Sequence, residues 1–343
     1  MQAIVQDKYG SADVLEAQDI NRPEIADDEV LVRVHAASIH VGDWILMTGV
    51  PYAMRMATGL RRPKHRVPGT DVAGTVEAVG PQVKGLRPAD EVLGWCNGSF
   101  AEYAAAPETN FVKKPASLSF EQAAAIGVSA TTALQLLRDD GKVRSGHKVL
   151  INGASGGVGT FAVQIAKAFG AEVTGVCSAR NVELVRSIGA DHVIEYTRED
   201  FRNGAEHYDL ILDNVGDRPM SDTRRALTPT GTLISNGGGH AGGKLGRTLR
   251  TMLVSIVVRQ QAGPTVKTQN HPDLLALTEL VEAGKVTPVI GGTYPLDRTA
   301  EAIGHVATGH ARGTLVLTVA TPPPAINSAG LPTEMRVATA AGA

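Results

Sequence analysis

One stretch of the chain, Val149 to Asn181, constrains the fold more than any other: VLINGASGGVGTFAVQIAKAFGAEVTGVCSARN. Gly153, Gly156 and Gly159 form a G-x-x-G-x-x-G turn, and Gly157 lies between the last two. An apolar run precedes the turn, a helical pattern follows it, and a second apolar run comes next. This order of strand, turn, helix and strand over about 30 residues is typical of a dinucleotide-binding βαβ unit.

The turn needs glycine for physical reasons. Glycines permit a tight turn and let the backbone approach a pyrophosphate, whose charge is bound by free N–H groups at the helix start. The alternative is a turn that only packs a helix against a sheet, but here the strand, the helix and the second strand all occupy their expected places. We therefore expect the turn to bind the cofactor through Gly153, Ser155, Gly156, Gly157, Val158 and Gly159.

The end of the stretch indicates which dinucleotide binds. An NAD site usually has Asp or Glu about 20 residues past the turn, where it bonds the ribose 2′-hydroxyl. No acidic residue stands there. Instead Ser178 offers a hydroxyl and Arg180 a permanent cation whose forked donors suit a 2′-phosphate. The sequence predicts NADPH, and the alternative for Arg180 is a solvated charge at a helix start.

Composition narrows the class of protein. The chain has 343 residues, of which 43% are hydrophobic, so two domains are expected. A net charge of −2 gives no general attraction to nucleic acid, and the longest apolar run, 252–258, is too short to span a membrane. The two cysteines, Cys96 and Cys177, are far apart and the N-terminus lacks a secretory pattern, which predicts a cytoplasmic protein.

The pattern of elements changes along the chain. Residues 1–118 contain short strand patterns separated by Gly and Pro. From Ser119, whose S-x-x-Q sequence with Gln122 predicts a helix cap, short apolar strands alternate with helices, and Gly170 is the expected cap at the end of the helix after the glycine turn. This alternation predicts an α/β domain with a parallel sheet covered on both faces. The proline-rich residues 321–343 predict a disordered tail.

Two kinds of catalytic site lack their characteristic residues in this sequence. A Tyr-x-x-x-Lys pair is excluded because none of the six tyrosines is followed four residues later by lysine. The ten histidines are scattered and show no H-E-x-x-H spacing, which argues against a zinc site. A basic stretch runs from Arg55 to Arg66, and we interpret it as a solvated loop. The alternative is that its charge attracts an anionic substrate such as a CoA thioester.

Several motifs together resemble one family. They include PGTDVAGTVEAVG, ADEVLGW, GSFAEYA, the glycine turn, IGADHVIEY and GHARGTLVLTV. The chain is similar to medium-chain dehydrogenases/reductases of the zinc-independent quinone oxidoreductase (zeta-crystallin-like) branch. The resemblance implies a GroES-like domain over 1–118 and 287–320 and a Rossmann-like doubly wound domain over 119–286.

The resemblance also implies site residues. Zinc alcohol dehydrogenases have a cysteine near HVGDW and G-H-E where this chain has Gly-Thr-Asp at 69–71, so no metal is expected. His40 replaces a family asparagine that lies near the nicotinamide ribose, with Asp43 three residues on. The alternatives for His40 are a bond to the ribose, a proton relay and a space-filling role. Tyr52 is the candidate proton donor or a pocket wall. The implied cofactor contacts are Thr132, Tyr196, Asn214, Gly216, Gly237 and Gly238.

The predicted function is a NADPH-dependent, metal-independent reductase of quinones or α,β-unsaturated carbonyls, with a small-molecule substrate and a homodimeric state. The alternatives are an enoyl-thioester reductase, a relative of zinc-type alcohol dehydrogenases, and a NADPH-responsive RNA-binding protein. Balanced charge argues against RNA as the main partner.

Overall fold

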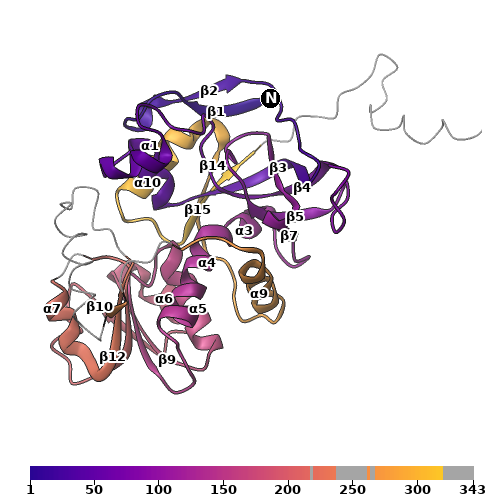
Figure 1. Ribbon diagram of the computed structural model, residues 1–343. Helices are drawn as coiled ribbons and strands as arrows, with labels where there is room; N and C mark the ends of the chain where they lie inside the picture. Colours follow the sequence, from indigo (N-terminus) through magenta and orange to yellow (C-terminus); the bar gives the residue numbers. More distant parts are fainter. Residues whose placement is uncertain (217–218, 237–260, 263–266, 320–343) are drawn as a thin grey trace, which may run out of the picture.

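The computed structural model describes residues 1–216, 219–236, 261–262 and 267–319. Gly237, Gly238, the 244–260 segment and the 321–343 tail lie outside the described residues. Within the described part the chain forms two lobes, each built on one large sheet (Figure 1). No described helix is long and apolar enough to cross a bilayer.

The first lobe contains a seven-stranded sheet in the order β14-β15-β3-β4-β5-β7, with β6 paired to β3. Its pairs are antiparallel except β14 with β15, and a small β1-β2 pair lies beside it. The strands are β1 (Gln2–Gln6), β2 (Leu15–Asp19), β3 (Glu29–Ile39), β4 (Asp71–Val79), β5 (Glu91–Trp95), β6 (Tyr103–Pro107), β7 (Phe111–Lys113), β14 (Ile290–Pro295) and β15 (Thr314–Thr318). Figure 1 shows the yellow β15 beside the indigo β3, so the last described strand completes the sheet of the N-terminal lobe.

The second lobe contains a six-stranded parallel sheet in the order β10-β9-β8-β11-β12-β13. Its strands are β8 (Lys148–Asn152), β9 (Glu172–Cys177), β10 (His192–Glu195), β11 (Tyr208–Asp213), β12 (Leu227–Ser235) and β13 (Gln261–Ala262). Relabelled in chain order this is the 3-2-1-4-5-6 arrangement of doubly wound dinucleotide-binding sheets. The strand order reverses between β8 and β11, which is where ligands bind in such sheets.

Helices cover both lobes. They are α1 (Val41–Thr48), α2 (Arg55–Thr58), α3 (Phe120–Ala124), α4 (Gly127–Gln135), α5 (Gly157–Ala168), α6 (Val182–Ser187), α7 (Met220–Thr223), α9 (His271–Glu282) and α10 (Thr299–Ala307). The predicted capping box begins α3: Ser119 Oγ accepts from Gln122 N at 3.2 Å, and Gln122 Oε1 accepts from Ser119 N at 3.0 Å. The end of α5 differs by one residue from the prediction, because Phe169 is the C-cap and Gly170 follows it at φ +80°.

The largest hydrophobic cluster spans both sheets. It contains Ala36, Ala73 and Leu93 of the first sheet together with Val149 and Ile151 of the second. Buried strands of this kind read as continuous apolar runs because both of their faces are covered. The lobes therefore share a core, and the site described below lies where their edges meet.

Candidate active site

The glycine turn has the close approach that its sequence predicts. Gly153 adopts φ +76°, and its N–H donates to Val176 O of β9 at 3.1 Å. A Cβ on Gly159 would lie 2.1 Å from Gly153 O, so the first turn of α5 touches the backbone before it. Only glycine fits at position 159, and the α5 N-terminus is thereby brought to the carboxyl end of β8.

No side chain caps the start of α5. Gly156 is the N-cap, and the N–H groups of the first helical turn begin at Gly157. Gly156 also forms a parallel bridge with Gly313. The segment before β15 closes one side, because Gly313 N donates to Ser155 O at 2.8 Å. Thr314 Oγ1, buried and without a hydrogen-bond partner, lies in the same place. These donors fit the pyrophosphate of a dinucleotide.

Ser178 is tied to the glycine turn by a buried amide, and Arg180 follows it two residues later. Asn181 Nδ2 donates to Ser155 Oγ at 2.9 Å and to Ser178 Oγ at 3.2 Å. Arg180 is exposed, and its Nη2 donates to His310 O at 3.1 Å, which leaves its other donors available. Asn181 therefore positions the two serines.

The remaining described cofactor candidates follow neighbouring strands. Tyr196 is half-exposed, and its N–H donates to Cys177 O, which places it next to Ser178. Asn214 Nδ2 donates to Asn152 O at 3.2 Å, and Gly216, at φ +67°, donates its N–H to the buried Asp213 carboxylate at 2.9 Å. The structure thus brings all of these residues to the carboxyl edge of the parallel sheet.

His40 and Asp43 form a buried pair at the start of α1. Asp43 Oδ2 accepts from His40 N at 2.9 Å and lies 3.5 Å from His40 Nε2. Both ring nitrogens of His40 and Oδ1 of Asp43 are buried without a hydrogen-bond partner. Burial raises the pKa of the Asp43 carboxyl to about 6, against the opposing effects of the His40 charge and backbone N–H. Buried polar atoms without partners are rare in folded proteins, so this pair is a candidate for a functional role.

Asp71 joins the two lobes next to this pair. Its buried carboxylate accepts from Ser38 Oγ at 2.8 Å, from Val128 N at 2.9 and 3.0 Å, and from Gln269 Nε2 at 2.8 Å. A Cβ on Gly127 would lie 2.1 Å from Asp71 Cγ, so α4 begins in direct contact with the carboxylate. Burial raises the pKa of Asp71, while His40 and the three donors oppose that shift.

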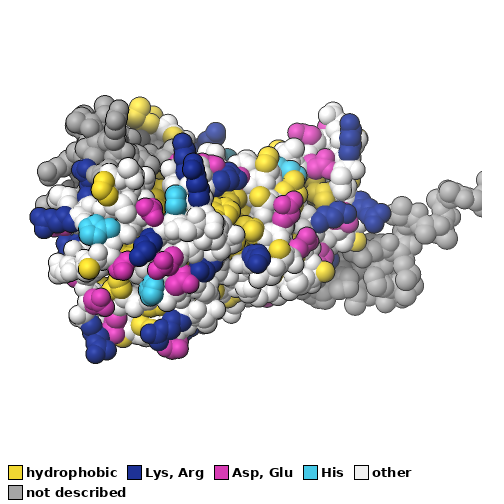
Figure 2. All heavy atoms as spheres, turned by 90° about the horizontal axis from the view of Figure 1, so that it is seen from below, with side chains coloured by type: hydrophobic (Ala, Val, Ile, Leu, Met, Phe, Trp, Pro, Cys, Tyr) yellow, Lys and Arg dark blue, Asp and Glu magenta, His cyan; other side chains and the backbone are white. Residues whose placement is uncertain are grey.

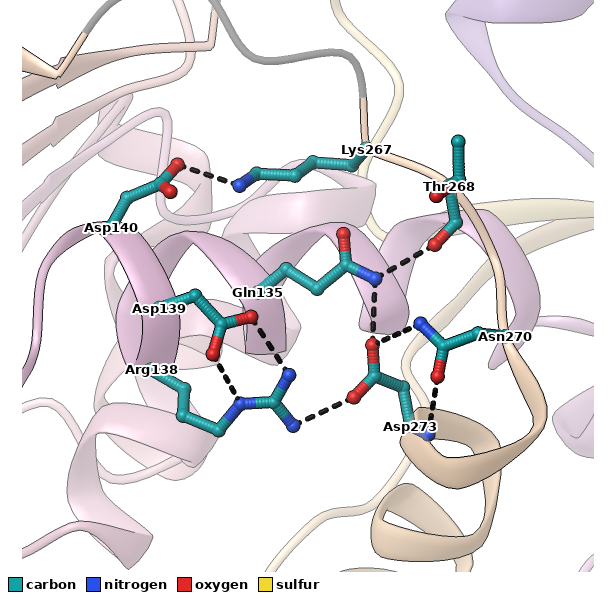
Figure 3. A network of polar contacts seen from close by, with 8 residues as sticks. All are labelled: Gln135, Arg138, Asp139, Asp140, Lys267, Thr268, Asn270 and Asp273. Carbon is teal, nitrogen blue, oxygen red and sulfur yellow. Dashed lines mark hydrogen bonds and ion pairs between the residues drawn. The ribbon is translucent and has the colours of Figure 1, made fainter.

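Thr132 lines a cavity of about 310 Å³ between α4 and the 267–269 segment, with Trp95 at its wall. Polar contacts hold that segment on α4 (Figure 3). Gln135 Nε2 donates to Thr268 O at 2.8 Å, and Lys267 Nζ lies 2.7 Å from Asp140 Oδ2. The amine of Lys267 points along the helix toward Asp140, so this ion pair fixes the wall of the cavity.

Tyr52 lies apart from the His40–Asp43 pair. It follows the other end of α1, is 72% exposed, and lines a separate hollow of about 640 Å³ with Trp44 and Thr48. The eight residues of α1 rise about 12 Å between these two places.

No group of three or more His, Cys, Asp or Glu side chains in the described ranges is arranged to hold a metal ion. Cys96 and Cys177 are free and buried. At the positions where zinc enzymes carry G-H-E, Thr70 and Asp71 follow Gly69, and Asp71 is already bonded to three donors.

The fold and this site define a two-lobe oxidoreductase that uses a dinucleotide. The chain matches family models described as "Alcohol dehydrogenase GroES-like domain" over 26–116 and "Zinc-binding dehydrogenase" over 188–317. It is 34% identical over 324 residues to 2-methylene-furan-3-one reductase of Solanum lycopersicum, covering 90% of this chain and 76% of that protein. It is also 34% identical over 336 residues to the NADPH-dependent alkenal/one oxidoreductase of Arabidopsis thaliana, covering 92% and 79%.

A solved structure, the quinone oxidoreductase from Coxiella burnetii, superposes with a TM-score of 0.81 at 30% identity over 93% of this chain and 99% of that one. The chain belongs to the medium-chain dehydrogenase/reductase superfamily, in its quinone oxidoreductase-like branch. The predicted GroES-like and Rossmann-like architecture is confirmed.

Five polar residues of the site were not among the sequence candidates: Asp71, Asn152, Asn181, Asp213 and Gln269. Each positions another group by hydrogen bonds. The signal that points to Asn152, Asp213 and Asp71 is a polar residue at one end of an apolar strand, as in VLIN, LILD and GTDVAG. Asn181 and Gln269 lie in no such pattern.

Proposed function

We propose that this chain reduces quinones or α,β-unsaturated carbonyls with NADPH and without a metal. One observation carries the cofactor choice: the Ser178–Asn181–Arg180 group lies at the carboxyl end of β9, and no carboxylate occupies the position that would bond a ribose 2′-hydroxyl. The names of relatives support the substrate class, because they include an alkenal/one oxidoreductase, a methylene-furanone reductase and quinone oxidoreductases.

Bound NADPH supplies a hydride. The protein holds the hydride donor and the acceptor at reacting distance, and it provides a proton for the oxyanion that develops on the acceptor. Thr132 and Trp95 line the cavity beside α4, and the glycine turn holds the dinucleotide. The two lobes supply these parts separately, and Asp71 joins them.

We assign the proton-holding role to His40, positioned by Asp43. The buried, unpartnered ring nitrogens of His40 and its 3.5 Å separation from Asp43 support this assignment. Tyr52 serves as a wall of its own hollow, because its exposure and its place beyond the C-terminal end of α1 separate it from that pair. Under this assignment His40→Asn lowers kcat, whereas Tyr52→Phe retains the kcat of the parent.

The proposal is tested by NADPH consumption, with NADH in parallel, against an ortho-quinone, a conjugated enone and an enoyl-CoA. Turnover of the quinone or the enone supports the proposal. Turnover of enoyl-CoA alone, lost in Tyr52→Phe, replaces it with an enoyl-thioester reductase. Salt-sensitive RNA binding that NADPH displaces, with every acceptor inert, replaces it with an RNA-binding function.

The finer features are part of the same proposal. We infer a homodimer, a cytoplasmic location, and domain limits of 1–118 with 287–320 and 119–286. Relatives carry names that place them in mitochondria or chloroplasts, so cell fractionation is the direct test of location. Sedimentation velocity tests the dimer, and limited proteolysis tests the limits.

A further inference from the structure

The segment between α1 and β4 exposes apolar side chains far more than the rest of the described surface. Of nine large apolar side chains exposed in the described ranges, seven lie between residues 41 and 60. Five of these form what we term the apolar patch: Val50, Tyr52, Met54, Met56 and Leu60. Met56 is 83% exposed and Leu60 72%. Single exposed apolar residues are ordinary, but a cluster of this kind indicates an interaction surface.

The residues that follow the patch are basic and exposed. We term them the basic segment: Arg61, Arg62, Lys64, His65 and Arg66. No acidic residue occurs in the sequence from 44 to 70. Two acidic groups of the described chain face the segment. Asp7 pairs with Arg66 at 2.7 Å, and the charge of Glu16 also acts on Arg66. The charge of Arg62 helps to lower the pKa of Asp7. The face drawn in Figure 2 mixes the two signs of charge.

Local contacts hold the patch in an ordered form. The Arg55 guanidinium lies 4.3 Å from the ring centre of Tyr9 and 4.7 Å from that of Tyr52, and its Nε donates to Gly49 O at 3.0 Å. Tyr9 Oη donates to Gly59 O at 2.7 Å. The apolar side chains thus project from a segment whose backbone is fixed, which lowers the entropy cost of binding a surface.

We propose that the apolar patch and the basic segment dock on the head-group layer of an anionic phospholipid bilayer. Apolar side chains beside a run of Lys and Arg are the chemistry of interfacial binding, because the former enter the acyl boundary and the latter attract anionic head groups. A single-stranded nucleic acid would require several aromatic rings for stacking, and the patch has only Tyr52. This inference goes beyond the reductase function and does not depend on it.

The test is sedimentation of the full chain with phosphatidylcholine vesicles, with and without phosphatidylserine. The chain pellets with the anionic vesicles, and added salt releases it. The double variants Met56→Ser/Leu60→Ser and Arg61→Gln/Arg62→Gln each partition more weakly, by on the order of tenfold. The matched control Leu275→Ser/Arg144→Gln changes an exposed leucine and an exposed arginine elsewhere and partitions like the parent.

Three results overturn the proposal. The first is equal recovery with both kinds of vesicle or with neither. The second is loss of an oligomer in Met56→Ser/Leu60→Ser without vesicle binding by the parent, which assigns the patch to a second copy of the chain. The third is salt-dependent binding of an RNA oligonucleotide that the basic-segment variant loses, with vesicles unbound. NADPH turnover of a soluble enone, measured on every variant, shows separately whether the reductase proposal holds.

Discussion

Replacing Arg180 by alanine tests which dinucleotide the site is built for. Arg180 is exposed at the carboxyl end of β9, next to Ser178, and one of its five donors is bonded to His310 O at 3.1 Å. Among the described residues no other acceptor bonds Arg180, so we expect its remaining donors to bond the 2′-phosphate of NADPH. NADH has no such phosphate, so the substitution should affect the two cofactors differently.

The size of the effect follows from the exposure of the side chain. Hydrogen bonds to charged groups contribute most when they are buried, and solvent reduces their contribution. We therefore expect the lower end of the range, a loss of about tenfold in kcat/KM for NADPH, with less than about twofold for NADH. Arg180→Lys keeps the charge but not the fork, and should lie between the parent and Arg180→Ala.

The assay is initial-rate kinetics with each cofactor at a fixed enone concentration. Arg186→Ala is the matched control: it removes an exposed arginine of the same lobe, one that pairs with Glu183 at 2.9 Å instead of facing the cofactor edge. An equal loss for NADPH and NADH in Arg180→Ala would mean that Arg180 only supports the fold. A parent enzyme that prefers NADH would refute the assignment of Ser178 and Arg180 to the phosphate.

Three further predictions concern the buried parts of the site. Gly159→Ala should weaken NADPH binding by more than about tenfold and lower Tm, because its Cβ would lie 2.1 Å from Gly153 O. The control Gly304→Ala, which has open space around it, should change neither quantity. NADPH titration and thermal melts measure the two effects. Asp43 has a folded-state pKa of about 6 against an ordinary 3.8, so its contribution to stability is complete below about pH 4 and is lost as the pH rises through about 6. Urea unfolding should show a decline of about 3 kcal/mol across that window that Asp43→Asn lacks, and identical slopes would contradict the burial argument. Asp71→Asn should cost about 1–3 kcal/mol in the same assay, since an amide cannot accept from all three donors, and an unchanged unfolding midpoint would show that the contact is dispensable.

The parts of the site that local sequence determines were predictable. Gly153 and Gly159 both belong to the glycine turn, so their spacing in the sequence predicts the close approach that the structure contains. Ser119 and Gln122 are equally local, and their capping box is confirmed. In each case both partners of the interaction are a few residues apart, and no knowledge of tertiary packing is needed.

The parts that depend on packing were not predictable in this way. Asn181 was not among the candidate site residues, because its position in the sequence indicates no role. Its burial between Ser155 and Ser178 comes from how β9 and α5 pack, which no local pattern reports. Asp71 likewise bonds Gln269, nearly two hundred residues away, and that distance in sequence hides the contact.

Contacts between the lobes connect these packing effects to function. Gly313 N reaches Ser155 O at one end of the cofactor edge, and Asp71 reaches Val128 N at the other, where α4 begins the cavity that Thr132 lines. Each bond joins the lobe that contains the His40–Asp43 pair to the lobe that contains the glycine turn. Because the lobes share one hydrophobic cluster, these bonds act within a packed core and fix the distance between the two halves of the site. A reaction that depends on holding two reactants at a set separation therefore depends on residues that touch neither of them.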